Sequence, residues 1–277
     1  MKTFSAVPGK ERSRKVACNL CLSNHYKTVL KNSDYLFVKC CSCGLIYQNP
    51  QAVFADLKDR YNADYFKYEF NNEENFFGLM KLGLKDIGME QLKPENGRGR
   101  FLDIGCATGK LMEDMKGRGW QVQGVDLCRE SAEYGWKKRK VRIFAGTLEQ
   151  AAFQSDCFNI VHSSHLIEHV PDPRAFVREI KRILLPGGQV IITTPNISGF
   201  QARLFRQRWR SAIADHLTLF SISTLKRLLR EEGFKVLKVR TWGGLAVGTA
   251  PLIIKKPADY LAKKFGFGDV MLFLVEK

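Results

Sequence analysis

The chain has 277 residues with a hydrophobic share of 45%, so it can bury a substantial core as one large domain or as a standard domain with a small attachment. Its formal net charge of +16 favours anionic partners such as nucleic acid, phosphorylated metabolites or an acidic membrane surface, and also fits a generic soluble basic protein. The absence of any apolar run of roughly 18 residues argues against a membrane-spanning helix. The basic N-terminus lacks a secretory signal, and together with eight cysteines this predicts a cytoplasmic protein.

Five of the eight cysteines lie before Pro50, in the stretches CNLC (18–21) and KCCSCG (39–44). Two C-x-x-C pairs separated by about twenty residues match the spacing of a zinc ribbon, because each tight turn presents two thiolates and four complete a tetrahedron. A segment of roughly 50 residues also needs such a staple to fold. Cys41 is spare in this pairing, and His25 is a further candidate that the site does not need. We predict a closed, structural Zn²⁺ site on Cys18, Cys21, Cys40 and Cys43.

The next region, residues 51–97, is rich in aromatic and acidic residues with mostly helical spacing, and it ends in the polar stretch KPENGRGR. Its aromatic residues Tyr61, Tyr65 and Phe66 could cover a ligand, but such a stripe is more often core, which we favour. The sequence therefore predicts three parts: a zinc-ribbon-like segment (1–50), a helical cap or linker (51–97) and a large C-terminal domain (98–277).

The third part alternates strand and helix patterns. Strands are predicted at 100–105, 120–126, 141–146, 158–164, 189–195, 234–242 and 271–277. Helices are predicted at 172–184 and at 221–233, the latter with Ser221 or Ser223 as its cap and Gly233 as its stop. Such alternation predicts an α/β fold with a parallel sheet covered on both faces and ligands bound at the carboxyl ends of the strands.

The stretch FLDIGCATGK (101–110) is a strand that turns sharply into a helix. A dinucleotide fingerprint would need three glycines where this chain has Gly105, Ala107 and Lys110, and a P-loop would need Ser or Thr where it has Leu111. A shorter G-x-A-x-G turn fits, with Asp126 at the tip of the next strand to accept both ribose hydroxyls. This predicts a site for one nucleoside rather than two.

The stretches LDIGCATGK, GVDL, FNIVHSSHLIEHVPDP, RILLPGGQVIITTPN and HLTLFSISTLKRLLREEGF together resemble a class I S-adenosylmethionine-dependent methyltransferase with an N-terminal zinc-binding segment. The resemblance covers about residue 97 to the C-terminus and implies a Rossmann-like, seven-stranded sheet with helices on both faces. The chain departs from the family's usual pattern at three positions. Ala107 replaces the commoner glycine, Asn159 stands where the family often has Asp, and Thr147 stands where an acid or amide often binds the adenine amine. The resemblance implies that the methionine moiety is contacted by Asp103, Gly105, Ala107 and Gly109. It implies that ribose and adenine are contacted by Asp126 and Leu127, and that adenine is flanked by Thr147 and Leu148. Ser164 and His165 would lie beside the sulfonium.

Methyl transfer from a sulfonium depends on holding the acceptor in line with the methyl group, and a positioned histidine is the usual base for a hydroxyl or amine. Of His165, His169 and His216, the last two are the best placed, although a lone histidine is more often structural. HLIEH also spells H-x-x-E-H, but a strand end before it and Pro171 after it argue against a zinc peptidase. Quinone-pathway O-methyltransferases resemble this segment and use it near a divalent ion, which leaves open whether Glu168 and His169 bind one.

The acceptor is the least defined part of the prediction. Residues 199–213 have near-helical apolar spacing with interleaved arginines and Trp209, which predicts an amphipathic helix that touches a membrane interface, frames a pocket for an anionic substrate, or only exposes a basic face. Residues 245–268 repeat this pattern. We predict O-methylation of a small-molecule, sugar or lipid-linked acceptor, with peripheral contact to the inner face of the membrane left open. The alternatives are an RNA methyltransferase that grips RNA with its ribbon and basic surface, and a binding module without catalysis.

Overall fold

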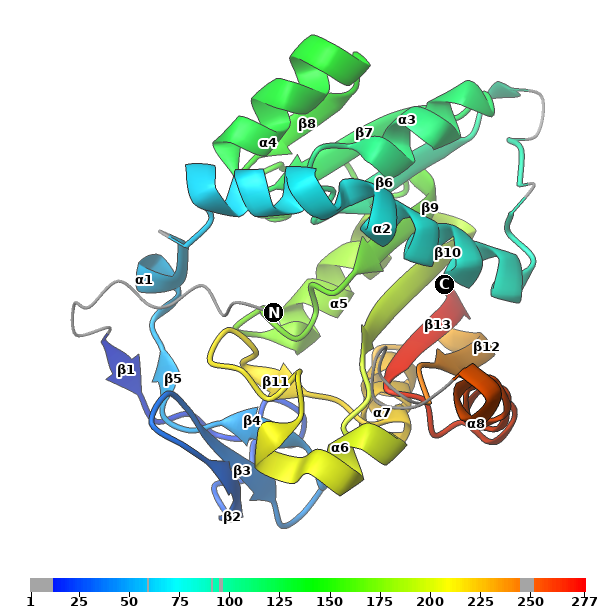
Figure 1. Cartoon of the computed structure of the whole chain (residues 1–277). Coiled ribbons are helices and arrows are strands. Elements are labelled where there is room, and N and C mark those ends of the chain that lie inside the picture. The colour runs from blue at the N-terminus through cyan, green and yellow to red at the C-terminus, as the bar shows by residue number, and fades with distance from the viewer. Residues whose placement is uncertain (1–11, 59, 91, 95–96, 245–251) are drawn as a thin grey trace.

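The computed structural model describes residues 12–58, 60–90, 92–94, 97–244 and 252–277 (Figure 1). Its centre is a seven-stranded sheet with the strand order β12-β13-β10-β9-β6-β7-β8. Its strands are β6 (Arg100–Ile104), β7 (Gln121–Asp126), β8 (Arg142–Ala145), β9 (Phe158–Ser164), β10 (Leu184–Pro195), β12 (Lys235–Trp242) and β13 (Val270–Glu276). The predicted α/β architecture is confirmed. The sheet is mixed rather than wholly parallel, because β13 inserts between β10 and β12 and pairs antiparallel with both.

Helices cover both faces of this sheet. On one face, α2 (Ala63–Ile87) and α3 (Lys110–Gly117) bury Leu84, Ile87 and Met115 against the strands. On the other face, α5 (Pro173–Ile183) and α7 (Ile222–Glu231) pack into a second cluster. The other helical segments are α1 (Phe54–Lys58), α4 (Arg129–Tyr134), a π-helix (Gly135–Arg139), α6 (Phe200–Phe205), a 3-10 turn (Arg206–Arg208) and α8 (Leu252–Phe265).

The helix signals in the sequence work as expected for α7. Ser221 is its N-cap and forms a capping box with Thr224, so the first choice of cap is confirmed over Ser223. Gly233 follows the helix with a φ of +78°, a left-handed conformation that glycine adopts without a Cβ penalty. These two residues set the length of the helix that packs under the sheet.

A second, four-stranded sheet has the order β11-β4-β3-β2 and forms the N-terminal ribbon. It comprises β2 (Tyr26–Lys31), β3 (Leu36–Cys40), β4 (Ile46–Gln48) and β11 (Thr218–Leu219), while β1 (Ser13–Arg14) pairs with β5 (Gln51–Ala52). The strand β11 comes from the C-terminal part of the chain, and Figure 1 shows it in yellow beside the blue strands. The division at residues 50 and 97 remains a proposal, and one sheet is shared across it.

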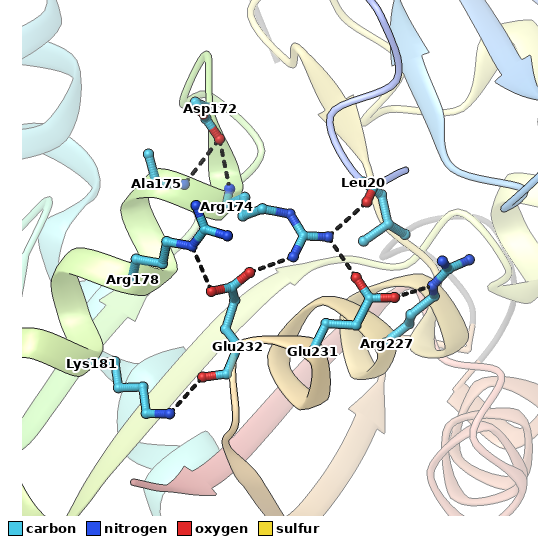
Figure 2. Close-up of polar contacts among 9 residues, drawn as sticks. All are labelled: Leu20, Asp172, Arg174, Ala175, Arg178, Lys181, Arg227, Glu231 and Glu232. Carbon is cyan, nitrogen blue, oxygen red and sulfur yellow. Dashed lines mark hydrogen bonds and ion pairs between the residues drawn. The ribbon is translucent and has the colours of Figure 1, made fainter. Parts of the chain in front are cut away.

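An ion-pair network fastens the ribbon to α5 and α7 (Figure 2). Arg174 donates through Nη2 to the Leu20 carbonyl at 2.7 Å and to Glu231 at 2.6 Å, and it also pairs with Glu232. Arg178 donates to the same Glu232 at 2.7 Å. Single exposed ion pairs contribute little to the free energy of unfolding. Arg174, however, joins α5 to the end of α7 and to the first cysteine turn, and so holds that turn against the large domain.

The prediction of one long helix over residues 199–213 is wrong. The structure ends α6 at Phe205, and Arg206 has a φ of +47°, which an α-helix does not accommodate. Trp209 is buried and donates to Asp269, so it does not face outward as an interfacial anchor. Residues 245–251 of the second basic stretch lie outside the described residues. In the described part of the chain, no helix combines the length and the apolar character needed to cross a bilayer.

Candidate functional site

The turn between β6 and α3 has the backbone that its glycines predict. Gly105, Ala107 and Gly109 all have positive φ values, of 72°, 46° and 78°. A Cβ on Gly109 would lie 2.8 Å from Cγ2 of Val141, so a side chain is excluded there on space as well as conformation. The turn therefore exposes backbone at the carboxyl end of β6, where a parallel sheet binds its ligands.

Asp126 ends β7 and ties two turns together. Its carboxylate accepts hydrogen bonds from the backbone N–H of Ala107 and of Cys128, each at 2.8 Å. The residue is 6% exposed, and burial raises the pKa of its carboxyl group to about 6 although both backbone N–H groups oppose the shift. A carboxylate has about four lone-pair sites, so two remain for a ligand's hydroxyl groups.

The neighbouring positions differ in how they meet the site. Gly146 donates its N–H to the Asp126 carbonyl at 2.8 Å, which brings the following Thr147 beside the Asp126 turn. Leu148 is buried, and Leu127 is half-buried. Asp103, predicted to face the methionine moiety, has one oxygen 2.7 Å from Nδ1 of a buried histidine, His162. Sequence reasoning missed His162, because its partner lies on the adjacent strand 59 residues away.

Helix α2, which lies on one face of the sheet, also contacts the turn through Glu73. Glu73 accepts a hydrogen bond from Oγ1 of Thr108 at 2.7 Å and pairs with Arg139 at 2.8 Å. Tyr61, Tyr65 and Phe66 are half-buried and lie outside the buried core clusters of the described residues, and the Asp126 carboxylate raises the pKa of both tyrosine hydroxyls, so their assignment to core or to ligand cover stays a prediction.

Tyr61 connects this turn to a second cluster. Burial raises the pKa of its hydroxyl, and the nearby carboxylates of Asp126 and Glu168 raise it further. Glu168 follows β9, which is separated from β7 by β6. The residues on either side of Tyr61 contact both places: Arg60 pairs with Asp215 beside His169, and the Asn62 carbonyl accepts from Sγ of Cys128. The nucleoside turn and the histidine cluster are thus parts of one region at the carboxyl ends of β6, β7 and β9.

The end of β9 carries Ser164 and His165. Ser164 is half-buried, and His165 is 49% exposed in its side chain with a φ of +53°, a conformation that few non-glycine residues adopt. The N–H of His165 donates to the Thr193 carbonyl, and its Nδ1 lies 3.3 Å from Oε1 of Glu168. His165 therefore projects from the strand end toward solvent with its ring beside a buried carboxylate.

His169 and His216, predicted as candidate bases, are brought together. Their ring centroids are 4.7 Å apart with planes at 80°. Nδ1 of His169 lies 2.9 Å from the Asp215 carbonyl and Nδ1 of His216 lies 2.8 Å from the Ser211 carbonyl. A carbonyl only accepts, so both Nδ1 atoms carry the proton. Burial lowers the pKa of both imidazoles, that of His216 to about 3, which leaves each ring neutral with a lone pair on Nε2.

Glu168 completes this cluster. It is 1% exposed, and its Oε2 accepts from Oγ1 of Thr194 at 2.8 Å. Burial raises the pKa of its carboxyl group, but the contact with the His165 ring outweighs this effect and lowers the pKa to about 2. Ligand atoms of Glu168, His169 and His216 lie within 4.8 Å of one another. Two neutral imidazoles and a carboxylate could serve as proton acceptors or as ligands of a divalent cation.

The four predicted cysteine ligands also meet. Their sulfur atoms lie within 4.8 Å of one another, with Cys18 and Cys43 3.4 Å apart and Cys21 and Cys40 3.5 Å apart. Tetrahedral thiolates on Zn²⁺ at about 2.3 Å are about 3.8 Å apart, so these positions fit the metal, and they are too far apart for a disulfide. The spare Cys41 is exposed, as pairing predicts.

Comparison with known proteins gives matches over the large domain. A family model described as a methyltransferase domain matches residues 76–239. A ubiquinone biosynthesis O-methyltransferase of Aeromonas salmonicida is 36% identical over 105 residues, which are 35% of this chain and 43% of that protein. One of Burkholderia pseudomallei is 30% identical over 156 residues, covering 51% of this chain and 66% of that protein. The chain thus spans less than half the length of the first of these relatives.

A solved structure from Thermotoga maritima shares the fold. It is titled a SAM-dependent methyltransferase, possible histamine N-methyltransferase, and it has a TM-score of 0.56 and 24% identity, covering 76% of this chain and 98% of that chain. This likeness confirms the predicted seven-stranded, Rossmann-like architecture.

Proposed function

Because the chain belongs to the methyltransferase-domain family, we propose that it transfers a methyl group from S-adenosylmethionine to a small-molecule, sugar or lipid-linked acceptor, on oxygen. The observation that carries this proposal is that one segment contacts both halves of the site: Arg60 pairs with Asp215 beside His169, and the Asn62 carbonyl accepts from Sγ of Cys128 in the Asp126 turn. A cofactor with its ribose on Asp126 would then present its methyl group toward His169 and His216. The O-methyltransferase names of the relatives support oxygen as the acceptor atom.

The residues present fit this cofactor, since Asp126 keeps lone pairs for ribose hydroxyls and the turn from Gly105 to Gly109 has the positive φ values of a tight strand-to-helix turn. The bound cofactor supplies an electrophilic methyl group. The protein aligns the acceptor oxygen with that group, which is most of the catalysis in an in-line displacement. Nε2 of His169 or His216 would take the hydroxyl proton of the acceptor as the methyl group leaves sulfur for oxygen, because each Nδ1 is already committed to a carbonyl.

We propose in the same way that Cys18, Cys21, Cys40 and Cys43 hold a structural Zn²⁺. The histidine cluster supports a second role beside that of a base. Glu168, His169 and His216 could bind a divalent cation that would orient the acceptor oxygen. Peripheral membrane contact is supported by exposed apolar side chains beside basic ones on α6 and α8. These apolar residues are Phe200, Leu204, Phe205, Ile253, Tyr260, Leu261 and Phe265.

The acceptor class is tested with methyl-labelled cofactor and a host-cell extract, counting label separately in the RNA, lipid and small-molecule fractions. We expect label in the lipid or small-molecule fraction, resistant to ribonuclease and absent without the protein. Label in RNA would instead establish the alternative, in which the basic surface and ribbon bind nucleic acid.

Replacing Asp126 by alanine should weaken S-adenosylmethionine binding by about tenfold or more, since each lost factor of ten corresponds to about 1.4 kcal/mol, the scale of a hydrogen bond to a charged group. The change also leaves the N–H groups of Ala107 and Cys128 without their acceptor. Titration calorimetry measures the affinity, with Asp156→Ala as a control because that carboxylate pairs with Lys277 at the far end of the sheet. Unchanged binding in Asp126→Ala would remove the ribose assignment.

Cofactor affinity should also fall as the pH drops through about 6, where burial places the pKa of Asp126. Protonation removes the acceptor for ribose hydroxyls, so binding needs the ionised form.

Folding stability has the opposite pH dependence. Because the pKa is raised in the folded chain, the contribution of Asp126 to stability is greatest at low pH and is lost as the pH rises through about 6. Affinity measured from pH 5 to pH 8, with thermal melts alongside, should therefore show weaker binding at low pH without loss of the fold. An affinity that is flat over this range would contradict the role given to Asp126.

A further inference from the structure

The ribbon contacts both segments that carry the clustered histidines. Nδ2 of Asn19, in the first cysteine turn, donates to the Pro171 carbonyl at 3.1 Å, two residues after His169. Nε2 of Gln48, at the end of β4, donates to the carbonyls of Ala214 at 2.8 Å and His216 at 2.7 Å. The ribbon is therefore hydrogen-bonded to both loops that carry the clustered histidines.

Gln48 makes the more extensive of these contacts. Its residue is 6% exposed, and its side-chain amide reaches a loop more than 160 residues away in the sequence. Its backbone N–H also donates to the Leu217 carbonyl at 2.9 Å, next to the pairing of β4 with β11. An amide NH₂ has two donors, which matches the two carbonyls, of Ala214 and His216, that accept from Nε2 of Gln48.

The loop from Ser211 to Leu217 is held between the ribbon and the large domain. On the inner side, the N–H groups of Leu217 and Thr218 both donate to the Glu168 carbonyl, at 2.8 and 3.1 Å. Within the loop, Nδ1 of His216 donates to the Ser211 carbonyl. The position of the His216 ring thus depends on the loop backbone, and Gln48 is the ribbon side chain that fixes this backbone from the outer side.

We propose that Gln48 is a positioning residue that couples the folded ribbon to the loop carrying His216, so that the ribbon keeps Nε2 of His216 beside His169. This inference rests on the proposed methyl transfer only for its catalytic consequence; the coupling itself is a property of the fold. Removal of the ribbon's metal should act on His216 by the same route, because β4 and the cysteine turns share one hydrophobic cluster that includes Tyr47 and Cys40.

The test compares Gln48→Met, which keeps the side-chain shape and removes the donors, with Asn49→Leu. Asn49 is an equally buried ribbon amide whose side chain bonds only to Val16 among the described residues. The readouts are zinc content, S-adenosylmethionine affinity, transfer of labelled methyl to the active extract fraction, and the imidazole ¹⁵N shifts of His216. The chain has five histidines, so these shifts can be assigned by single substitutions.

In Gln48→Met we expect unchanged zinc and cofactor binding, loss of the single Nδ1–H tautomer of His216, and a rate lower by about tenfold to a hundredfold, because small misplacements near the reacting atoms have effects of this size. Asn49→Leu should keep the wild-type His216 signal. A wild-type tautomer in Gln48→Met, or an equal change in both variants, would overturn the proposal.

A second measurement decides the matter if Gln48→Met does not fold. Zinc is released from the wild-type chain with a mercurial thiol reagent while the His216 signal is followed. A change in that signal in step with zinc release supports the coupling, and an unchanged signal after full release overturns it. Should the wild type transfer no methyl group at all, the proposed function fails while the tautomer readout still judges the role of Gln48.

Discussion

Replacing Cys40 by serine is expected to abolish zinc binding and to lower the free energy of unfolding by at least about 4 kcal/mol, a loss typical of a removed metal site. The reason lies in how the ribbon is built. Cys18 and Cys40 are buried in the same hydrophobic cluster as α5 and α7, so a ribbon without its metal would also uncover the large domain. Metal analysis of the purified protein and denaturant unfolding measure the two effects.

The adjacent Cys41 provides a matched control. It is exposed and lies outside the four-sulfur cluster, so Cys41→Ser should keep one zinc per chain and change stability by no more than about 0.5 kcal/mol. Purified wild-type protein without zinc, or equal effects of the two substitutions, would contradict the assignment of the metal ligands. Because Cys40→Ser could prevent folding, release of zinc from the wild type by a thiol reagent gives the stoichiometry independently.

Alanine at His169 or at His216 is expected to slow methyl transfer by about a hundredfold or more if that residue is the general base, the usual range being 10² to 10⁴. Both rings are neutral, with the proton fixed on Nδ1 by a backbone carbonyl, so either Nε2 can accept the proton. The initial rate of label transfer is measured at saturating cofactor and acceptor. Cofactor affinity should not change, because among the described residues no hydrogen bond joins either ring to Asp126.

His25→Ala is the control for this experiment, since His25 is an exposed ribbon residue outside both candidate metal clusters. If a histidine variant transfers methyl as fast as the wild type at saturating substrate, the substituted histidine is not the general base. Dialysis against a chelator separates the two uses of the cluster: lost activity that returns with added divalent cation, while the ribbon keeps its zinc, assigns Glu168, His169 and His216 to cation binding.

Local signals in the sequence were sufficient for the parts of the fold that depend on neighbouring residues. The turn at Gly105 to Gly109, the acid at Asp126 and the cap at Ser221 each follow from backbone conformation or capping chemistry within a few residues. The four cysteines were predicted from spacing alone, because tetrahedral coordination fixes which residues can meet. These are the features for which composition and spacing determine geometry.

Long-range partners were not predictable from such signals. The strand β11 has two residues, too few to show a period, and it joins the ribbon sheet only because β4 offers a free edge. The contact of Gln48 with the His216 loop and the pair of Asp103 with His162 join segments that are distant in sequence. The helix predicted over 199–213 failed because Trp209 is buried on Asp269, a tertiary contact that outweighs helical spacing.

The structure of the protein in complex with S-adenosylhomocysteine, determined by crystallography, tests the proposed site most directly. We predict ribose hydroxyls within hydrogen-bonding distance of the Asp126 carboxylate and a sulfur atom that faces His169 and His216. A ligand bound elsewhere, or a sulfur atom turned away from the two imidazoles, would contradict the placement of methyl transfer at this end of the sheet.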